Sequence, residues 1–83
     1  MKHRDRTDIT ASILRSAIKG VNKTKIMHES LMSFTQTNYY LDHLVENKVI
    51  RYDEQARLFK ITDKGIKFLH TYEKISQLLS DNN

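Results

Sequence analysis

One stretch of this 83-residue chain constrains its fold more than any other. Residues 33–65 predict a helix, a tight hairpin and the start of a second helix, with few residues between them. The helix is expected over residues 33–45, where apolar side chains recur every three or four positions. Residues 49–52 and 57–62 alternate apolar and polar side chains, as the paired strands of a hairpin do. This order predicts a mainly helical domain with a small β-hairpin.

Local signals set the ends of these elements. Ser33 and Gln36 have the S-x-x-Q spacing of a capping box, in which each side chain accepts a backbone N–H of the other residue at the start of a helix. The tip at residues 53–56 lacks glycine, so a four-residue loop is expected rather than a two-residue turn. Thr62 is positioned to cap a last helix over residues 63–80, about 27 Å long at 1.5 Å per residue.

Two further helices precede this unit. The first is expected over residues 8–19, with Thr7 or Asp8 as its cap and apolar residues along one face. Gly20 follows it, where a left-handed residue often ends a helix. The second helix is short and is expected over residues 25–31.

The composition narrows the class of protein. The chain is 39% hydrophobic and 29% charged, as in a single soluble globular domain. Its 14 Lys and Arg residues exceed its 10 Asp and Glu residues, and the net charge of +4 suits a polyanion such as nucleic acid, although many small proteins carry as much. It has no cysteine, which excludes disulfides and thiolate metal sites. No signal-peptide core or apolar run of ~20 residues is present, so we expect a cytoplasmic protein without a membrane partner.

No constellation of residues predicts catalysis. No pair of carboxylates flanks a plausible cleft, and no serine, histidine and aspartate fall on converging elements. The four histidines lie on separate segments without the spacing of metal ligands, and no glycine-rich phosphate loop is present. We therefore expect no enzyme activity, no cofactor, no metal and no small-molecule substrate.

The helix over residues 33–45 has two faces. The inner face is expected to carry Phe34, Thr37, Leu41, Leu44, Val45 and Lys48, and it is apolar apart from Thr37 and the exit residue Lys48. The outer face carries hydrogen-bonding side chains at i, i+3, i+4 and i+7, with Thr35 beside them: Gln36, Tyr39, Tyr40 and His43. In a helix-turn-helix the second helix places such residues against base edges in the major groove, where Gln pairs with adenine. Cations before it and in the hairpin would meet phosphates: Lys23, Lys25, Arg57 and Lys60.

Plainer interpretations stand beside this one. An outward Gln or Thr is usually only solvated, Tyr40 is expected to brace the hairpin, and His43 is a bystander as readily as a contact. The helix has no Lys or Arg before Lys48 and carries Asp42 and Glu46, whereas most specific readers contact guanine through a cation. Modest, salt-sensitive binding with an A·T bias is therefore expected.

The two ends of the chain have their own patterns. Residues 1–7 form a basic arm, in which Arg4 and Arg6 contact DNA or simply fray. In the last helix four residues are spaced 4, 3 and 4 apart, the narrow seam of a coiled coil: Phe68, Tyr72, Ile75 and Leu79. We expect this seam to join two copies in a homodimer, because an 18-residue helix is longer than the surface that so small a domain can cover. Packing on the chain's own first helix is the alternative.

Five segments together resemble the small archaeal winged helix-turn-helix DNA-binding proteins, a family of predicted transcriptional regulators, from residue 8 to residue 79. The most specific is the T-x-K-G step into the last helix, Thr62-Asp63-Lys64-Gly65. The others are Gly20 with Thr24-Lys25-Ile26-Met27, Ser33-Phe34, Tyr40-Leu41-Asp42-His43-Leu44 and Lys48-Val49-Ile50. The resemblance implies a winged helix, double-stranded DNA as ligand and homodimers joined through the C-terminal helix, as an antiparallel coiled coil in chromatin-associated members. It implies groove contacts at Thr35, Gln36, Asn38 and Tyr39, with Arg57 on the wing.

The sequence thus predicts a winged helix-turn-helix with an extended C-terminal dimerisation helix. We expect a flexible arm over residues 1–7, the DNA-binding domain over residues 8–62 and the dimerisation helix over residues 63–83. The expected function is binding of double-stranded DNA as a transcriptional regulator or nucleoid-associated protein, with the third helix in the major groove and the wing on the backbone. The alternative, which Asp42 and Glu46 favour, is a protein–protein interaction module without DNA binding.

Overall fold

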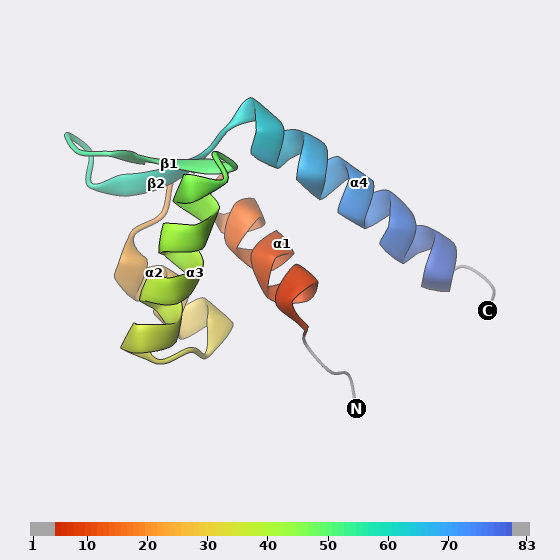
Figure 1. Cartoon of the computed structure of the whole chain (residues 1–83), viewed down its shortest axis with the longest axis horizontal. Helices are drawn as coiled ribbons and strands as arrows, with labels where there is room; N and C mark the ends of the chain where they lie inside the picture. The colour runs from red at the N-terminus through yellow and green to blue at the C-terminus, as the bar shows by residue number, and fades with distance from the viewer. Residues whose placement is uncertain (1–4, 81–83) are drawn as a thin grey trace.

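The computed structural model describes residues 5–80, which form four helices and one two-stranded antiparallel hairpin. The elements follow in this order: α1 (Arg6–Ser16), α2 (Lys23–Ser30), α3 (Phe34–Glu46), β1 (Ile50–Asp53), β2 (Leu58–Ile61) and α4 (Asp63–Ser80). α2 and α3 lie beside each other beneath the hairpin, α1 lies next to them, and α4 runs outward from the far end of the hairpin (Figure 1). This is the mainly helical arrangement with a hairpin wing and a long last helix that the sequence predicts.

α1 begins at Arg6, two residues earlier than expected, because Asp5 caps it. The Asp5 carboxylate accepts a hydrogen bond from the Asp8 N–H (2.9 Å), and the Asp8 carboxylate accepts one from the Asp5 N–H (3.3 Å). This reciprocal pair is a capping box, so Thr7 and Asp8 lie inside the helix rather than at its cap. Arg6 therefore belongs to α1 and not to an arm, whereas Arg4 lies outside the described residues.

α1 also ends earlier than expected, because the chain after it pairs with the hairpin. The Ala17 carbonyl accepts a hydrogen bond from the Ile61 N–H (3.0 Å), and Val21 exchanges two hydrogen bonds with Phe59 of β2. The turn between them uses Gly20 at φ +90°, a conformation that costs glycine little. Val21 thus adds a single antiparallel bridge to β2, outside the two-stranded hairpin.

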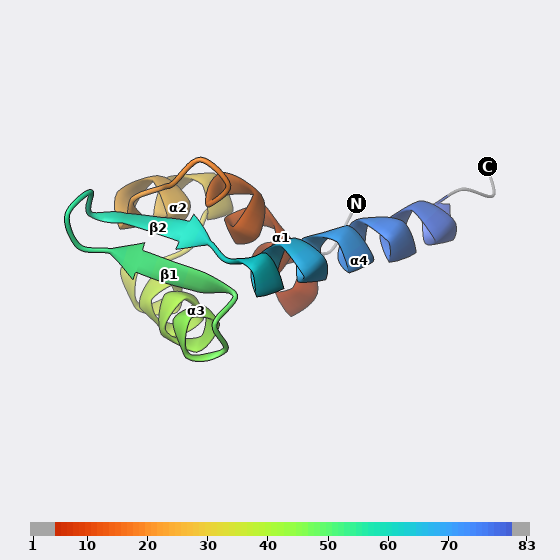
Figure 2. The ribbon, with the colours of Figure 1, turned by 90° about the horizontal axis from the view of Figure 1, so that it is seen from above.

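The hairpin pairs Ile50 with Ile61 and Tyr52 with Phe59, and Asp53 with Leu58 at its tip. The loop has four residues, as predicted, but spans residues 54–57 instead of 53–56. Asp53 is the last paired residue because its carboxylate accepts the N–H groups of Gln55 and Ala56, which closes the turn. Figure 2, from above, shows β1 on the α3 side and β2 on the α2 side.

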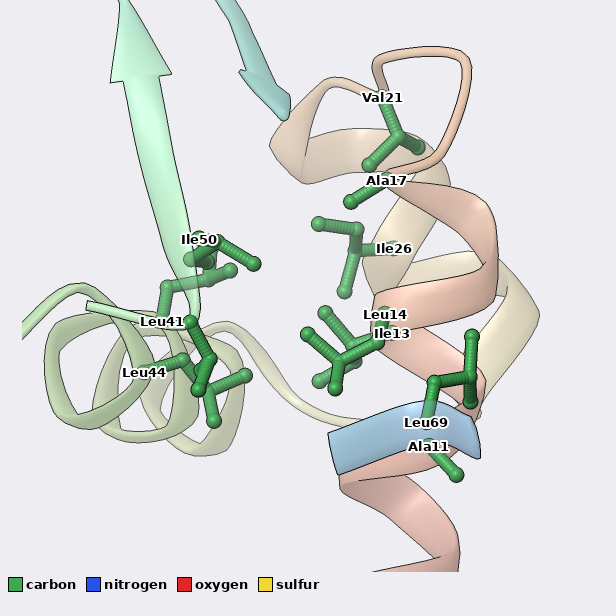
Figure 3. Close-up of a cluster of buried hydrophobic side chains, with 11 residues drawn as sticks. Ala11, Ile13, Leu14, Ala17, Val21, Ile26, Leu41, Leu44, Ile50 and Leu69 are labelled. Atoms are coloured by element: carbon green, nitrogen blue, oxygen red, sulfur yellow. The ribbon is translucent and has the colours of Figure 1, made fainter. Parts of the chain in front are cut away.

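A single core draws on all four helices and on β1 (Figure 3). Ile13 and Leu14 of α1 lie at its centre, between Ile26 of α2 and the leucines of α3. The apolar residues buried in it are Ala11, Ile13, Leu14, Ala17, Val21, Ile26, Leu41, Leu44, Val49, Ile50 and Leu69. Full burial of one such leucine or isoleucine contributes roughly 1.5–3 kcal/mol, so this cluster fixes how α3 is rotated.

The T-x-K-G step explains how α4 is attached. The Thr62 hydroxyl donates to the Lys48 carbonyl (2.6 Å) and accepts from the Gly65 N–H (3.1 Å), which confirms Thr62 as the cap of α4. Gly65 lies so close to the turn before β1 that a Cβ atom would be 2.2 Å from the Val49 carbonyl oxygen. The first turn of α4 therefore packs directly on backbone, and only glycine fits.

Replacing Gly65 with Ala is expected to lower the free energy of unfolding by about 2 kcal/mol, because the new methyl group overlaps the Val49 carbonyl. In an unconstrained helix the same change stabilises by up to about 1 kcal/mol, so the sign is diagnostic. Urea denaturation followed by circular dichroism measures the effect. The exposed Lys67→Ala variant serves as control and should stay within about 0.5 kcal/mol of the parent; a Gly65→Ala variant as stable as the parent would contradict the close approach.

Candidate nucleic-acid interface

The predicted capping box of α3 is present and has a consequence for recognition. The Ser33 Oγ accepts the Gln36 N–H (3.1 Å), and the Gln36 Oε1 accepts the Ser33 N–H (3.0 Å). Paired recognition of adenine would need that same Oε1 atom to accept the N6 amino group. Gln36 therefore contacts a base with both side-chain atoms only if the box opens, at a cost of about 1 kcal/mol.

The core sets which side of α3 faces outward. Thr37, Leu41 and Leu44 are buried, and at about 100° per residue the opposite side is centred on Tyr39 and Glu46. Thr35 and Asp42 complete this exposed face. Relative to it, Gln36 and His43 lie on the flank towards α1, and Asn38 lies on the flank towards α2. The outer face predicted from the sequence is thus rotated by part of a turn.

Two residues of α3 differ from their predicted burial. Phe34 and Val45 were expected to face inward but are exposed, since they lie beside the core rather than over it. The Lys23 ammonium lies 5.2 Å from the centre of the Phe34 ring, which holds this lysine against the start of α3. Tyr40 is half-buried and faces the start of α1.

Tyr39 is held by a residue for which the sequence gave a different role. Its hydroxyl accepts a hydrogen bond from the Arg6 guanidinium (2.7 Å), and the guanidinium carbon lies 5.9 Å from the ring centre. The His43 ring stacks parallel to the Tyr39 ring, with 6.2 Å between centres and 2° between planes. Tyr39 remains 52% exposed. The first residue of α1 therefore orients the largest side chain of the outer face.

Cations lie on the wing side of α3. Lys23 and Arg57 line a hollow of about 430 Å³ between the start of α2 and the hairpin. The side chains of Lys25 and Arg57 are exposed and make no hydrogen bond or ion pair within residues 5–80, so both are available to an anion. Lys25 lies outside this hollow, beside the end of α1. The start of α2 adds the partial positive charge of a helix N-terminus. These groups are placed to meet a phosphate backbone.

Lys60, also predicted to contact DNA, has a partner within the hairpin. Its ammonium lies 3.0 Å from the Asp53 carboxylate, and both side chains are half-buried. The Ala56 N–H, the Lys60 ammonium and the Gln55 N–H together hold the pKa of Asp53 below its ordinary value of 3.8. This cluster shapes the loop that presents Arg57 at φ +58°.

The seam of α4 is divided into two parts. Phe68 and Tyr72 pack against the core, and the Tyr72 hydroxyl donates to the Asp8 carboxylate, a bond that raises the pKa of Tyr72. Arg15 and Glu73 form an ion pair at 3.3 Å beside it. The C-terminal half of α4 extends away from the rest of the molecule, as Figure 2 shows. Its apolar residues are exposed there: Ile75 is 52%, Leu78 73% and Leu79 75% exposed.

The sequence model of the winged helix-turn-helix family matches residues 3–80. This chain belongs to the winged helix-turn-helix family. Such domains typically bind DNA and are usually non-catalytic. A search among curated proteins gave no match. Within residues 5–80, no helix combines the length and apolar character that a membrane span needs, and no three potential metal ligands cluster.

The pKa of Asp53 tests the structure of the wing tip. Because its folded value is lowered, the contribution of Asp53 to stability is present above pH 3.8 and is lost as pH falls through the folded value. A carboxyl-detected NMR titration should place its midpoint below 3.8, and Lys60→Gln should raise it while the two backbone hydrogen bonds remain. A midpoint at or above 3.8 would mean that the loop is not held in this way.

Proposed function

We propose that this winged helix-turn-helix protein binds double-stranded DNA as a transcriptional regulator or nucleoid-associated protein, similar to those of archaea. The observation that carries the proposal is the outer face of α3. It is left uncovered by the rest of residues 5–80, and cations from α2 and the wing lie beside it. The major groove is wide enough to admit such a helix.

The proposed roles follow from position and chemistry. Thr35, Asn38 and Tyr39 contact base edges, with Asn38 suited to adenine, and Gln36 joins them when its capping box opens. His43 supports the Tyr39 ring and lies one turn further along. Phosphate contacts, which supply affinity but no sequence information, come from Lys23, Lys25 and Arg57. Lys60 acts indirectly by fixing the wing loop through Asp53.

One observation favours a second function. Asp42 and Glu46 are exposed on the outer face of α3, and the helix itself contains no Lys or Arg. Two carboxylates would repel phosphates, so DNA affinity must come from the flanking cations and is expected to be modest. The same face would suit a protein partner with a basic surface, in which case the domain is an interaction module without DNA contact.

Fluorescence anisotropy with a labelled duplex at several salt concentrations separates the two functions. DNA binding should weaken as salt rises, with a slope in log affinity of about −0.9 per phosphate contact. Arg57→Gln should weaken binding to all sequences and reduce the slope by about 0.9. Lys74→Gln removes an equal charge from the outward part of α4 and should change neither. Absence of salt-dependent binding would contradict the DNA proposal and favour the interaction module.

We further propose that the exposed part of α4 joins two copies. Ile75, Leu78 and Leu79 form an apolar surface at the end of a helix that has left its own core. Pairing of two such ends would cover them and would hold two α3 helices for successive major-groove faces, about 34 Å apart. Phe68 and Tyr72 would then contribute at the edge, since α1 already covers part of each.

The double variant Ile75→Glu with Leu79→Glu is expected to be a monomer, because two buried carboxylates would repel each other across the interface. Light scattering should give 9.8 kDa for it and twice that mass for the parent. Lys74→Glu, an exposed charge change on the same helix, should leave the dimer intact. If the parent itself has the mass of one chain at micromolar concentration, the proposed interface does not exist.

A further inference from the structure

A second hollow lies on the other side of α3, between α3, the start of α1 and the first turns of α4. Its volume is about 390 Å³, within the range of small-molecule sites in proteins. Figure 1 shows α1 and α3 beneath the start of α4. The residues that line the hollow come from these three helices and from the turn before β1. The DNA proposal uses only its rim, at Tyr39 and His43.

The lining of this hollow is cationic. Arg6 reaches it from α1 and Lys64 from α4, and none of its eleven lining residues is acidic, although the chain has 10 Asp and Glu residues. The Lys64 ammonium donates one hydrogen bond to the Asn47 carbonyl (2.9 Å) and retains two further N–H groups. Arg6 likewise donates to Tyr39 with one of its five N–H groups. An anion would find donors on both sides.

The remaining walls are aromatic and apolar. Tyr39 and Tyr40 meet edge to face, with 5.8 Å between ring centres and 88° between planes. Phe68 of α4 also lines the hollow, together with the buried Leu44 and Val49. Aromatic walls favour a flat ring, since ring pairs add to the gain from burial alone. The cations would bind a carboxylate, and the aromatic side chains would pack against a ring. The lining therefore suits a small molecule in which a carboxylate is attached to an aromatic ring.

Arg6 connects this hollow to the outer face of α3. A carboxylate is a stronger acceptor for a guanidinium than a phenol, because it carries a full negative charge and can accept two parallel N–H bonds from the guanidinium. A bound carboxylate would therefore draw Arg6 away from the Tyr39 hydroxyl. Tyr39 would lose the partner that orients it on the face proposed to contact DNA.

We propose that this hollow is a regulatory site for small aromatic carboxylates, whose binding weakens DNA binding through the Arg6–Tyr39 hydrogen bond. The regulatory half of the proposal rests on the proposed DNA function, and the binding half does not. Reciprocity requires DNA to weaken binding of the carboxylate by the same factor.

NMR on the full chain tests the binding half, with 2-naphthoate as probe and uncharged 2-naphthamide as its matched control. Naphthoate should cause saturable shifts of the amide signals of Thr10, His43 and Asn47. The dissociation constant of naphthamide should be higher than that of naphthoate by about tenfold or more. Lys64→Gln should weaken naphthoate about tenfold, Lys64→Arg should restore it, and the exposed Lys67→Gln should have no effect. Equal binding of acid and amide, or shifts that map elsewhere, would overturn the site.

DNA titrations with and without saturating naphthoate test the regulatory half. The ligand should weaken DNA binding roughly fivefold, and naphthamide at the same concentration should have no effect. Tyr39→Phe removes the acceptor that competes for Arg6, so it should bind naphthoate more tightly and lose the effect of naphthoate on DNA. Naphthoate binding without a change in DNA affinity would overturn the regulation. If the chain binds naphthoate in the hollow but does not bind DNA, the proposed function is contradicted and the proposed ligand site is still supported.

Discussion

The packing of α3 on the core around Ile13 and Leu14 decides where every candidate contact lies. Burial of Thr37, Leu41 and Leu44 fixes the rotation of α3 and leaves Thr35, Tyr39, Asp42 and Glu46 facing outward. Figure 3 shows Leu41 and Leu44 on the core side of α3. Thr37 is tolerated in this core because its hydroxyl donates to the Ser33 carbonyl (2.8 Å). Since helices pack as rigid bodies, a change in this contact would move the whole outer face at once.

α3 has different chemistry on its two flanks. Towards α2 and the wing lie the cations that suit a phosphate backbone, and towards α1 lies the cationic, aromatic hollow. Tyr39 touches both regions: it is exposed on the outer face, and its hydroxyl is held by Arg6 at the rim of the hollow. A single hydrogen bond therefore lies between the proposed reading surface and the proposed ligand site. Because it is partly exposed, it is weak enough to be exchanged for a better acceptor.

Features that depend on residues close together in the sequence could be predicted. They are the Ser33–Gln36 capping box, the hairpin, the Thr62 cap and the bounds of α4. The start of α1 at Arg6 also depends on a local signal, because Asp5 and Asp8 have the spacing of a capping box. The prediction missed this signal and placed the cap at Thr7 or Asp8. Contacts between distant segments could not be predicted. Arg6 and Tyr39 are 33 residues apart, and Lys60 meets Asp53 only because the hairpin register brings them together. The rotation of α3 and the division of the α4 seam likewise depend on tertiary packing, which periodicity does not specify.

The central claim is that duplex DNA meets the surface formed by the start of α2, the outer face of α3 and the wing tip. Titration of the isotope-labelled chain with a short duplex, followed residue by residue by NMR, tests it most directly. The largest amide shifts are expected at residues 23–25, 35–39 and 57, with little change beyond residue 73. Shifts concentrated on α4, or none at stoichiometric DNA in low salt, would contradict it.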